Sequence, residues 1–378
     1  MDPVFFNKKI MKNILFKITV LCLIISSCST SDEIISLNDN FDRKLILENT
    51  YDNIIVPAFN DFDNKLKVLE NDATNFSNNA SQENLENLRK SWEDAYISWQ
   101  SVAMFNLRKA EEIFYADIMN TYPCNESLIE SNIQDSIHEI TAISINNLGS
   151  TGLPAFGYLI YGLGGDSINV LSYYNSNDAD KYKAYLVALI NNMTYSTDLV
   201  INDWTNNRYD FVNSSGNTST SSLNLIINDF LQYFEKRVRE AKIATPSSIR
   251  GDLTPKPNQI ESLYKPEINK ILLESAFSSV ERFYYGYSYS GLSNGTGLED
   301  YLSALENTND LRNEIDNQIN DVNQKISLLD NNFILQLENN PQAMWDVFYS
   351  MQNLITYTKS DMLSKFNISS DYMDNDGD

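Results

Sequence analysis

The hydrophobic positions of this chain recur mostly at intervals of three and four residues. The clearest case is residues 85–103, where charged side chains fill the positions between the apolar ones. The apolar residues there are Leu85, Leu88, Trp92, Tyr96, Trp99 and Ala103. This spacing predicts an amphipathic helix. We expect Ser81 to be its N-cap, because a serine hydroxyl can accept a hydrogen bond from a free N–H group of the first turn.

The same period appears in several further segments, whereas alternation with a period of two is scarce. These segments are residues 45–69, 182–204, 223–243 and 268–284. Near the C-terminus, Asn340 and Pro341 predict the N-cap and the first residue of another helix. The chain is therefore predicted to be all-α, with long helices packed as antiparallel bundles.

A polar segment without periodicity, residues 213–222, separates two halves of similar size. Such a composition is typical of a linker or a long surface loop. The 378 residues are enough for two domains of ordinary size. We expect residues 41–212 to form an N-terminal helical bundle, and residues 223–378 to form a C-terminal bundle with an acidic tail.

The N-terminus has the pattern of an export signal. Lys12 precedes an apolar stretch, residues 14–25, that is too short to span a bilayer as a mature helix. We expect residues 1–27 to be a signal peptide. Met11 is the more natural start, because the residues before it add nothing to a signal that is already complete.

The residues that close this signal indicate a lipid anchor. The sequence Ile-Ser-Ser-Cys at residues 25–28 resembles a bacterial lipobox, so Cys28 is predicted to carry lipid and to anchor the protein in a membrane. Residues 28–40 would be the tether. Residues 29–33 resemble the acidic export signals of Bacteroidetes lipoproteins. We therefore expect an outer-membrane lipoprotein that faces either the periplasm or the exterior.

Charge and cysteine content exclude two further possibilities. The formal net charge is −23, which disfavours nucleic acid as a partner because phosphate backbones are repelled. With Cys22 removed in the signal and Cys28 lipidated, Cys124 remains alone, so no internal disulfide framework is expected. Cys124 lies in a connector that contains proline, and we expect it to be a small, buried apolar residue.

Five parts of the chain, in this order, resemble the imelysin family of insulin-cleaving-type peptidases. They are residues 51–59, 88–100, 151–162, 240–246 followed by 259–264, and 374–378. The resemblance extends from about Leu45 to Asp378. It implies two tandem antiparallel four-helix-type bundles, a fold that agrees with the periodicity and with the linker.

Residues 152–162 align with the family's signature segment, but two of its chemical groups are missing. In many members this segment reads Gly-x-His-x-x-Glu, whose His and Glu share a helix face and can meet at one metal ion. Here Gly152 is kept, while Pro154 replaces the His and Gly157 replaces the Glu. We expect Pro154 and Gly157 to open the start of the helix, with backbone groups facing the cleft between the bundles.

The resemblance also implies which residues lie at a ligand-binding cleft. These are Gly152, Pro154, Gly157, Trp92, Trp99, Glu261 and Tyr264. Trp92 and Trp99 lie seven residues apart on one helix face, so each is a core residue or a pocket residue. The aromatic run at residues 283–289 leaves the same choice.

Other candidate metal ligands are sparse. The single histidine, His138, is followed by Glu139, but residue 142 is Ala, so no His-Glu-x-x-His helix exists. Alternating carboxylates in the tail resemble the start of a Ca²⁺ loop, although the chain ends before the bidentate Glu that would complete it. They are Asp374, Asp376 and Asp378.

Two functions from different classes follow. The first is a lipid-anchored, non-catalytic protein that binds a ligand or partner. The resemblance implies iron or haem as its ligand and outer-membrane uptake proteins as partners, since family members often accompany iron or haem uptake. The second is a divergent metallopeptidase whose metal is held elsewhere, which only the family's peptidase label supports.

Overall fold

The computed structural model describes residues 41–136, 145–165 and 168–371. Within these ranges the chain forms helices and no strand, and the described residues belong to one compact unit. The all-α prediction is confirmed. Several predicted residues lie outside the described ranges, namely Cys28, His138, Asp374, Asp376 and Asp378.

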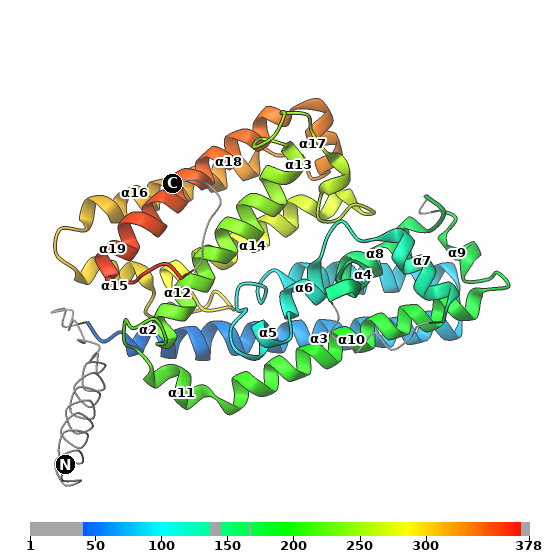
Figure 1. Ribbon diagram of the computed structural model, residues 1–378, viewed down its shortest axis with the longest axis horizontal. Coiled ribbons are helices and arrows are strands. Elements are labelled where there is room, and N and C mark those ends of the chain that lie inside the picture. The colour runs from blue at the N-terminus through cyan, green and yellow to red at the C-terminus, as the bar shows by residue number, and fades with distance from the viewer. Residues whose placement is uncertain (1–40, 137–144, 166–167, 372–378) are drawn as a thin grey trace, which may run out of the picture. The chain divides into compact units, whose positions relative to one another are not determined.

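The first group of helices contains three long ones that pack side by side (Figure 1). They are α3 (Val56–Asn78), α4 (Gln82–Trp99) and α10 (Ala179–Asn206). Shorter helices accompany them: α2 (Lys44–Asn49), α5 (Lys109–Glu112), α6 (Tyr115–Asn120), α7 (Glu126–Gln134), α8 (Gly152–Gly157), α9 (Val170–Tyr173) and α11 (Arg208–Asn213). The Ser81 hydroxyl accepts from the N–H of Asn84 at 3.3 Å, so the predicted N-cap of α4 is confirmed.

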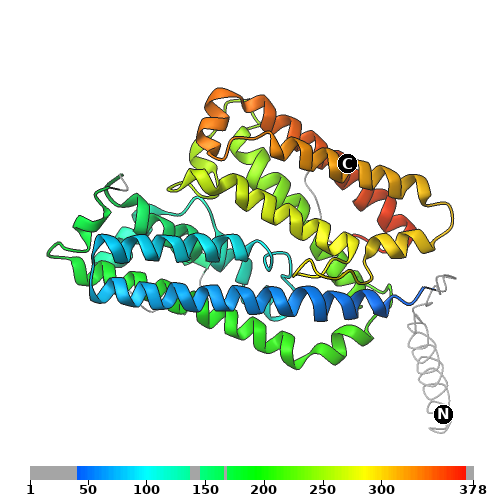
Figure 2. The ribbon, with the colours of Figure 1, turned by 180° about the vertical axis from the view of Figure 1, so that it is seen from behind.

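Residues 214–221 lead from α11 into a second group of helices, seen from behind in Figure 2. Its longer members are α12 (Ser222–Gln232), which continues as the π-helix η5 (Tyr233–Ala244), then α14 (Asn269–Tyr285), α16 (Asn309–Ser327) and α18 (Pro341–Ile355). The shorter ones are α13 (Thr245–Ser247), α15 (Leu298–Ala304), α17 (Phe333–Asn339), the π-helix η8 (Thr356–Met362) and α19 (Leu363–Phe366). Asn340 precedes α18 as predicted, but its side chain makes no capping hydrogen bond.

A proline in the first group creates a contact with the second. Pro57 has no N–H, so the carbonyl of Asn53, four residues earlier, lacks its usual helical partner. That carbonyl instead accepts from the N–H of Tyr289 at 2.7 Å. The backbone just before the proline forms a π-helix, η1 (Thr50–Ile55). Because of the proline, the carbonyl of Asn53 is free to form a hydrogen bond that links the two groups of helices.

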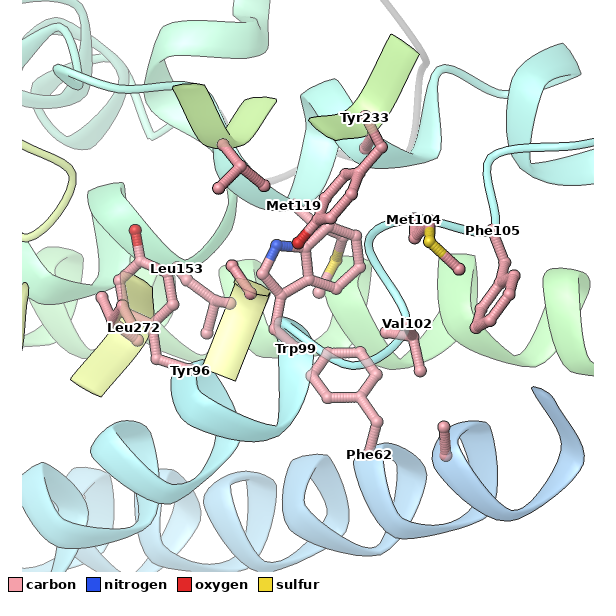
Figure 3. Packing of buried hydrophobic residues seen from close by; sticks show 14 of the residues in the cluster. Phe62, Tyr96, Trp99, Val102, Met104, Phe105, Met119, Leu153, Tyr233 and Leu272 are labelled. Atoms are coloured by element: carbon pink, nitrogen blue, oxygen red, sulfur yellow. The ribbon is translucent and has the colours of Figure 1, made fainter. Parts of the chain in front are cut away.

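The apolar core is continuous between the two groups of helices. Figure 3 shows Trp99 at its centre, with Phe62 of α3 on one side and Tyr233 of η5 on another. The Phe62 and Trp99 rings have centroids 5.5 Å apart. Burial of such large side chains stabilises the fold by about 1.5–3 kcal/mol each. Trp99 is therefore part of the core.

Candidate functional site

The signature segment begins at a glycine that no other residue can replace without strain. Gly152 has φ +76°, and a Cβ atom there would lie 2.3 Å from the carbonyl oxygen of Met119. The neighbouring Thr151 hydroxyl donates to the carbonyl of Ile118 at 3.1 Å. The start of α8 is thus fitted against the end of α6, so Gly152 has a structural role there.

Pro154 and Gly157 do not open the helix, which corrects our expectation. Pro154 is the third residue of α8, where its missing N–H would have had no helical partner in any case. A Cβ at Gly157 would lie 2.7 Å from Cζ2 of Trp92, so the glycine makes room for the indole ring. The indole Nε1 in turn donates to the carbonyl of Leu153 at 2.9 Å. Gly157 therefore lets Trp92 pack directly on α8.

Beyond Gly157 the helix widens into the π-helix η3 (Tyr158–Gly162) and ends at a kink, where Gly164 has φ 74°. Two carbonyl groups of this stretch accept hydrogen bonds from side chains. Ile160 accepts from Arg89 Nε at 2.9 Å, and Leu159 accepts from the Tyr174 hydroxyl at 3.1 Å. These two carbonyl groups are thus hydrogen-bonded within the first group of helices.

Five of the residues predicted from the resemblance line one small cavity of about 10 Å³. They are Trp92, Pro154, Gly157, Glu261 and Tyr264. Its volume is close to the space that a single water molecule needs. Gly152 lies apart, against α6, and Trp99 lines a neighbouring cavity of about 30 Å³. The structure therefore brings the signature segment together with residues 261–264.

Tyr264 and Cys124 form the outer wall of this cavity. The Tyr264 hydroxyl donates to Glu126 Oε1 at 2.7 Å and lies 3.4 Å from Sγ of Cys124. Burial raises the pKa of the Cys124 thiol to about 11, so the thiol is protonated at neutral pH and is a poor nucleophile. Cys124 is only partly buried, yet its chemistry is that of the inert residue predicted from the sequence.

A buried ion pair separates the two cavities. Lys242 of η5 and Glu261 pair directly, and their side chains are 5% and 2% exposed. Gln100 bonds to both partners: its Oε1 accepts from Lys242 Nζ at 3.0 Å, and its Nε2 donates to Glu261 Oε1 at 3.0 Å. Asn120 Nδ2 also donates to Glu261 Oε1, at 2.7 Å. Together these bonds satisfy both charges away from water, as buried charges require.

Sequence reasoning missed Gln100, Asn120 and Lys242. Gln100 directly follows the apolar face of α4, and Lys242 lies among the apolar positions of η5. Each of these two residues is a polar side chain on the buried face of a predicted helix, and this pattern could have indicated a buried polar contact. It does not by itself name a partner, because 79 of the 378 residues carry a charge, the sum of 28 basic and 51 acidic ones.

The cavity beside Trp99 and Lys242 continues into a larger groove. The groove measures about 390 Å³ and shares Ala103, Tyr233 and Arg237 with that cavity. Side chains of both charges line it, among them Asp229 and Lys236. Its size is within the range of small-molecule sites. A ligand in this groove would contact Tyr233 and Arg237, which also line the cavity beside Lys242 of the buried pair.

Asp229 has an unusual environment in this groove. Burial raises its pKa to about 8, and the negative charge of Glu111 adds to the effect. The N–H of Asn106, which donates to Asp229 Oδ2 at 2.7 Å, acts in the opposite direction by favouring the charged form. Asp229 therefore holds a proton in the folded protein at a pH where an ordinary aspartate is charged.

This protonation predicts a pH dependence of stability. The folded-state pKa lies above the ordinary value of 3.8, so the unfolded chain releases a proton that the folded chain keeps. Stability should then fall as the pH rises from about 4 to about 8, and level off above that. Between pH 6 and pH 8 the wild type should lose about 1–2 kcal/mol relative to Asp229→Asn, after allowance for the partial exposure of the side chain. Urea unfolding of both proteins at each pH measures this difference, and parallel pH profiles would contradict it.

These observations define a class of protein: an all-α protein whose two packed groups of helices hold a polar, buried site between them. The chain belongs to the imelysin family, whose sequence profile matches residues 55–360. Among solved structures, it is similar to an iron-regulated protein A precursor from Parabacteroides distasonis ATCC 8503. That pair shares 15% identity and a TM-score of 0.70, over 86% of this chain and 95% of the other.

A second solved structure, an imelysin-like protein from Psychrobacter arcticum 273-4, is similar at 14% identity and a TM-score of 0.68. The match covers 88% of this chain and 99% of that protein. No curated protein sequence matches the chain. At these identities the two structures establish the fold alone.

The described residues do not fit the metal site that the family's peptidase label implies. A zinc site needs about three ligands from His, Cys, Asp or Glu. The side chains of Pro154 and Gly157 cannot ligate a metal, and within the described ranges no three candidate ligands come together. Glu261, which lines the same cavity as Pro154 and Gly157, is already paired with Lys242. No catalytic step through a metal follows from this arrangement.

Proposed function

We propose that this protein is a lipid-anchored, non-catalytic member of the imelysin family that binds a ligand or partner in the cell envelope, in connection with iron acquisition. The observation that carries the proposal is the signature segment itself. Its two chemical positions hold Pro154 and Gly157, which pack against Trp92 where other members have a His and a Glu. This supports a scaffold that is retained for binding.

The groove along α12 and η5 is the proposed binding site. The small cavities at the signature segment are too small for haem or a ferric chelate, whereas the groove, at about 390 Å³, is large enough for a small-molecule ligand. The link to iron rests on the similar structure described as an iron-regulated protein A precursor.

Haem and ferric citrate titrations into the purified protein test this proposal. We expect one of the two to bind, and Ala241→Phe to weaken binding by at least about tenfold because Ala241 lines both the groove and the inner cavity. Ala188→Phe on α10, which lines neither, is the matched control. If neither probe binds, the iron link is wrong. Stoichiometric zinc together with proteolysis that a chelator abolishes would instead support the divergent metallopeptidase.

The anchor is tested separately. Among the described residues no helix is both long and apolar enough to cross a bilayer. Cys28→Ala should release the protein from the membrane fraction and abolish incorporation of labelled fatty acid, because the thiol is the proposed attachment point. Cys124→Ala should leave both unchanged. Continued labelling of Cys28→Ala would exclude Cys28 as the lipidated residue.

A further inference from the structure

A second cleft, of about 400 Å³, lies on a different face of α4 from Trp92 and Tyr96. Three helices line it: α3, α4 and α14, together with Tyr289 from the loop that follows α14. Serine side chains dominate its walls, so the helices leave space where larger residues would fill it. They are Ser98, Ser101, Ser275 and Ser278. The cleft shares no lining residue with the groove along α12 and η5.

Two carboxylates of this cleft are already occupied by neighbouring side chains. Asp61 Oδ2 accepts from the Ser98 and Tyr289 hydroxyls, each at 2.8 Å. Asp94 pairs with Lys90 one turn earlier on α4. Lys90 therefore balances the charge of Asp94, whereas the two neutral hydroxyls hold Asp61 in the wall of the cleft without cancelling its charge.

Three other charged side chains in the cleft have no such partner. Within the described residues, no hydrogen bond or ion pair engages the side chains of Lys65, Glu274 or Arg282. For Arg282 this is unusual, because burial lowers the pKa of its guanidinium. The guanidinium carbon lies 5.2 Å from the centroid of the Tyr289 ring.

The carboxylate adjacent to Arg282 in the sequence is also engaged elsewhere. Glu281 Oε1 accepts from Asn323 Nδ2 of α16 at 2.6 Å, and Glu281 does not line the cleft, although its charge acts on Arg282 through space. A partly buried guanidinium without a bonded anion is unfavourable, and a carboxylate from outside could supply two parallel hydrogen bonds to it. The aromatic ring would hold the guanidinium plane in position for that contact.

The spacing of the unpaired groups along α14 defines the kind of ligand. Glu274, Ser278 and Arg282 follow one another at intervals of four residues, so they lie on one helix face. Glu274 and Arg282 are separated by about 12 Å along the helix axis, at about 1.5 Å per residue. A fully extended chain of three residues spans about 10 Å. A negative group can thus meet Arg282 while a positive group of the same molecule meets Glu274.

We propose that this cleft binds a small, extended zwitterion that has a carboxylate at one end, paired with Arg282, and an ammonium group at the other, paired with Glu274. Lys65 lies one turn after Asp61 on α3, so the charges of these two lining residues offset each other, and the ligand carries no net charge. The volume of the cleft suits a molecule of this length. The serine hydroxyls between the two ends supply hydrogen bonds to its polar middle.

Isothermal titration calorimetry with trialanine as the probe tests the proposal. Trialanine should bind to the wild-type protein, whereas trialanine amide, which lacks the carboxylate, and N-acetyl-trialanine, which lacks the ammonium group, should each bind at least about tenfold more weakly. Equal binding of all three peptides would overturn the proposal, and so would the absence of trialanine binding at millimolar concentration.

Variants locate the site. Arg282→Gln should weaken trialanine binding by at least about tenfold. Ser278→Phe should abolish binding by filling the cleft, and because Ser278 is exposed this change leaves the core intact. Arg312→Gln on α16, outside the cleft, is the matched control and should bind as the wild type does. Unchanged trialanine binding by Ser278→Phe would show that the site lies elsewhere. This conclusion holds even if Arg282→Gln fails to fold.

Discussion

Replacing Glu261 with Gln should lower the free energy of unfolding by about 3–5 kcal/mol, because it leaves the buried Lys242 without its counter-charge. Lys242 is 5% exposed, and burial already lowers the pKa of its ammonium group. Denaturant unfolding monitored by circular dichroism measures the change as a shift of the midpoint at constant slope. A loss smaller than about 1 kcal/mol would contradict the assignment of a buried, charged pair.

The double variant Lys242→Met with Glu261→Gln separates charge from packing. The introduced glutamine side chain can still accept the hydrogen bonds of Gln100 and Asn120, and the introduced methionine fills the space of the lysine stem without a charge. We therefore expect the double variant to recover most of the lost stability, a coupling of about 2–3 kcal/mol.

An exposed pair from the same segment is the control. Lys265 Nζ and Glu267 Oε2 lie 3.4 Å apart at the surface, so Glu267→Gln should cost less than about 1 kcal/mol. If Glu261→Gln and Glu267→Gln had similar effects, burial of the first pair would not matter to stability.

The buried pair also shows what the sequence could and could not predict. Glu261 was predicted only through the resemblance to the imelysin family, because 51 acidic residues make any single one inconspicuous. Its partner Lys242 lies 19 positions earlier and meets it through the fold. Hydrophobic periodicity predicts which face of a helix is buried, but it does not predict which polar side chains face one another across two helices.

The helices themselves were predicted well where their apolar faces are long. The segment 182–204 corresponds to α10, and 268–284 corresponds to α14. The π-helical stretches were not predicted, since a π turn changes the hydrogen-bond register without disturbing the apolar period much. α16 was also missed, although its buried residues, such as Ile315 and Ile319, follow helical spacing. Its high content of Asn, Asp and Gln obscured the pattern.

The signature segment is the clearest case in which the effect of two residues on a helix was misjudged. Pro154 and Gly157 were expected to loosen α8. Instead, Gly157 leaves space for the Trp92 ring, and Pro154 lies in the first turn, where a missing N–H breaks no helical hydrogen bond. Sequence alone could not show this, because the reason for Gly157 is a side chain 65 positions away, the difference between 157 and 92. The retained glycine, Gly152, is likewise explained by a neighbouring backbone.

Gly152→Ala should destabilise the protein by about 2–5 kcal/mol. The positive φ of 76° costs an alanine about 1–2 kcal/mol, and the overlap with the carbonyl oxygens of Ile118 and Met119 adds about 1–3 kcal/mol because backbone must move. Gly165→Ala is the matched control, since Gly165 has φ 75° and nothing within 4 Å of the position of a Cβ. It should show the conformational cost alone. Urea unfolding measures both losses. Equal losses for the two variants would mean that the backbone of α6 moves aside without cost, and this would contradict a rigid contact between α6 and α8 that positions the signature segment.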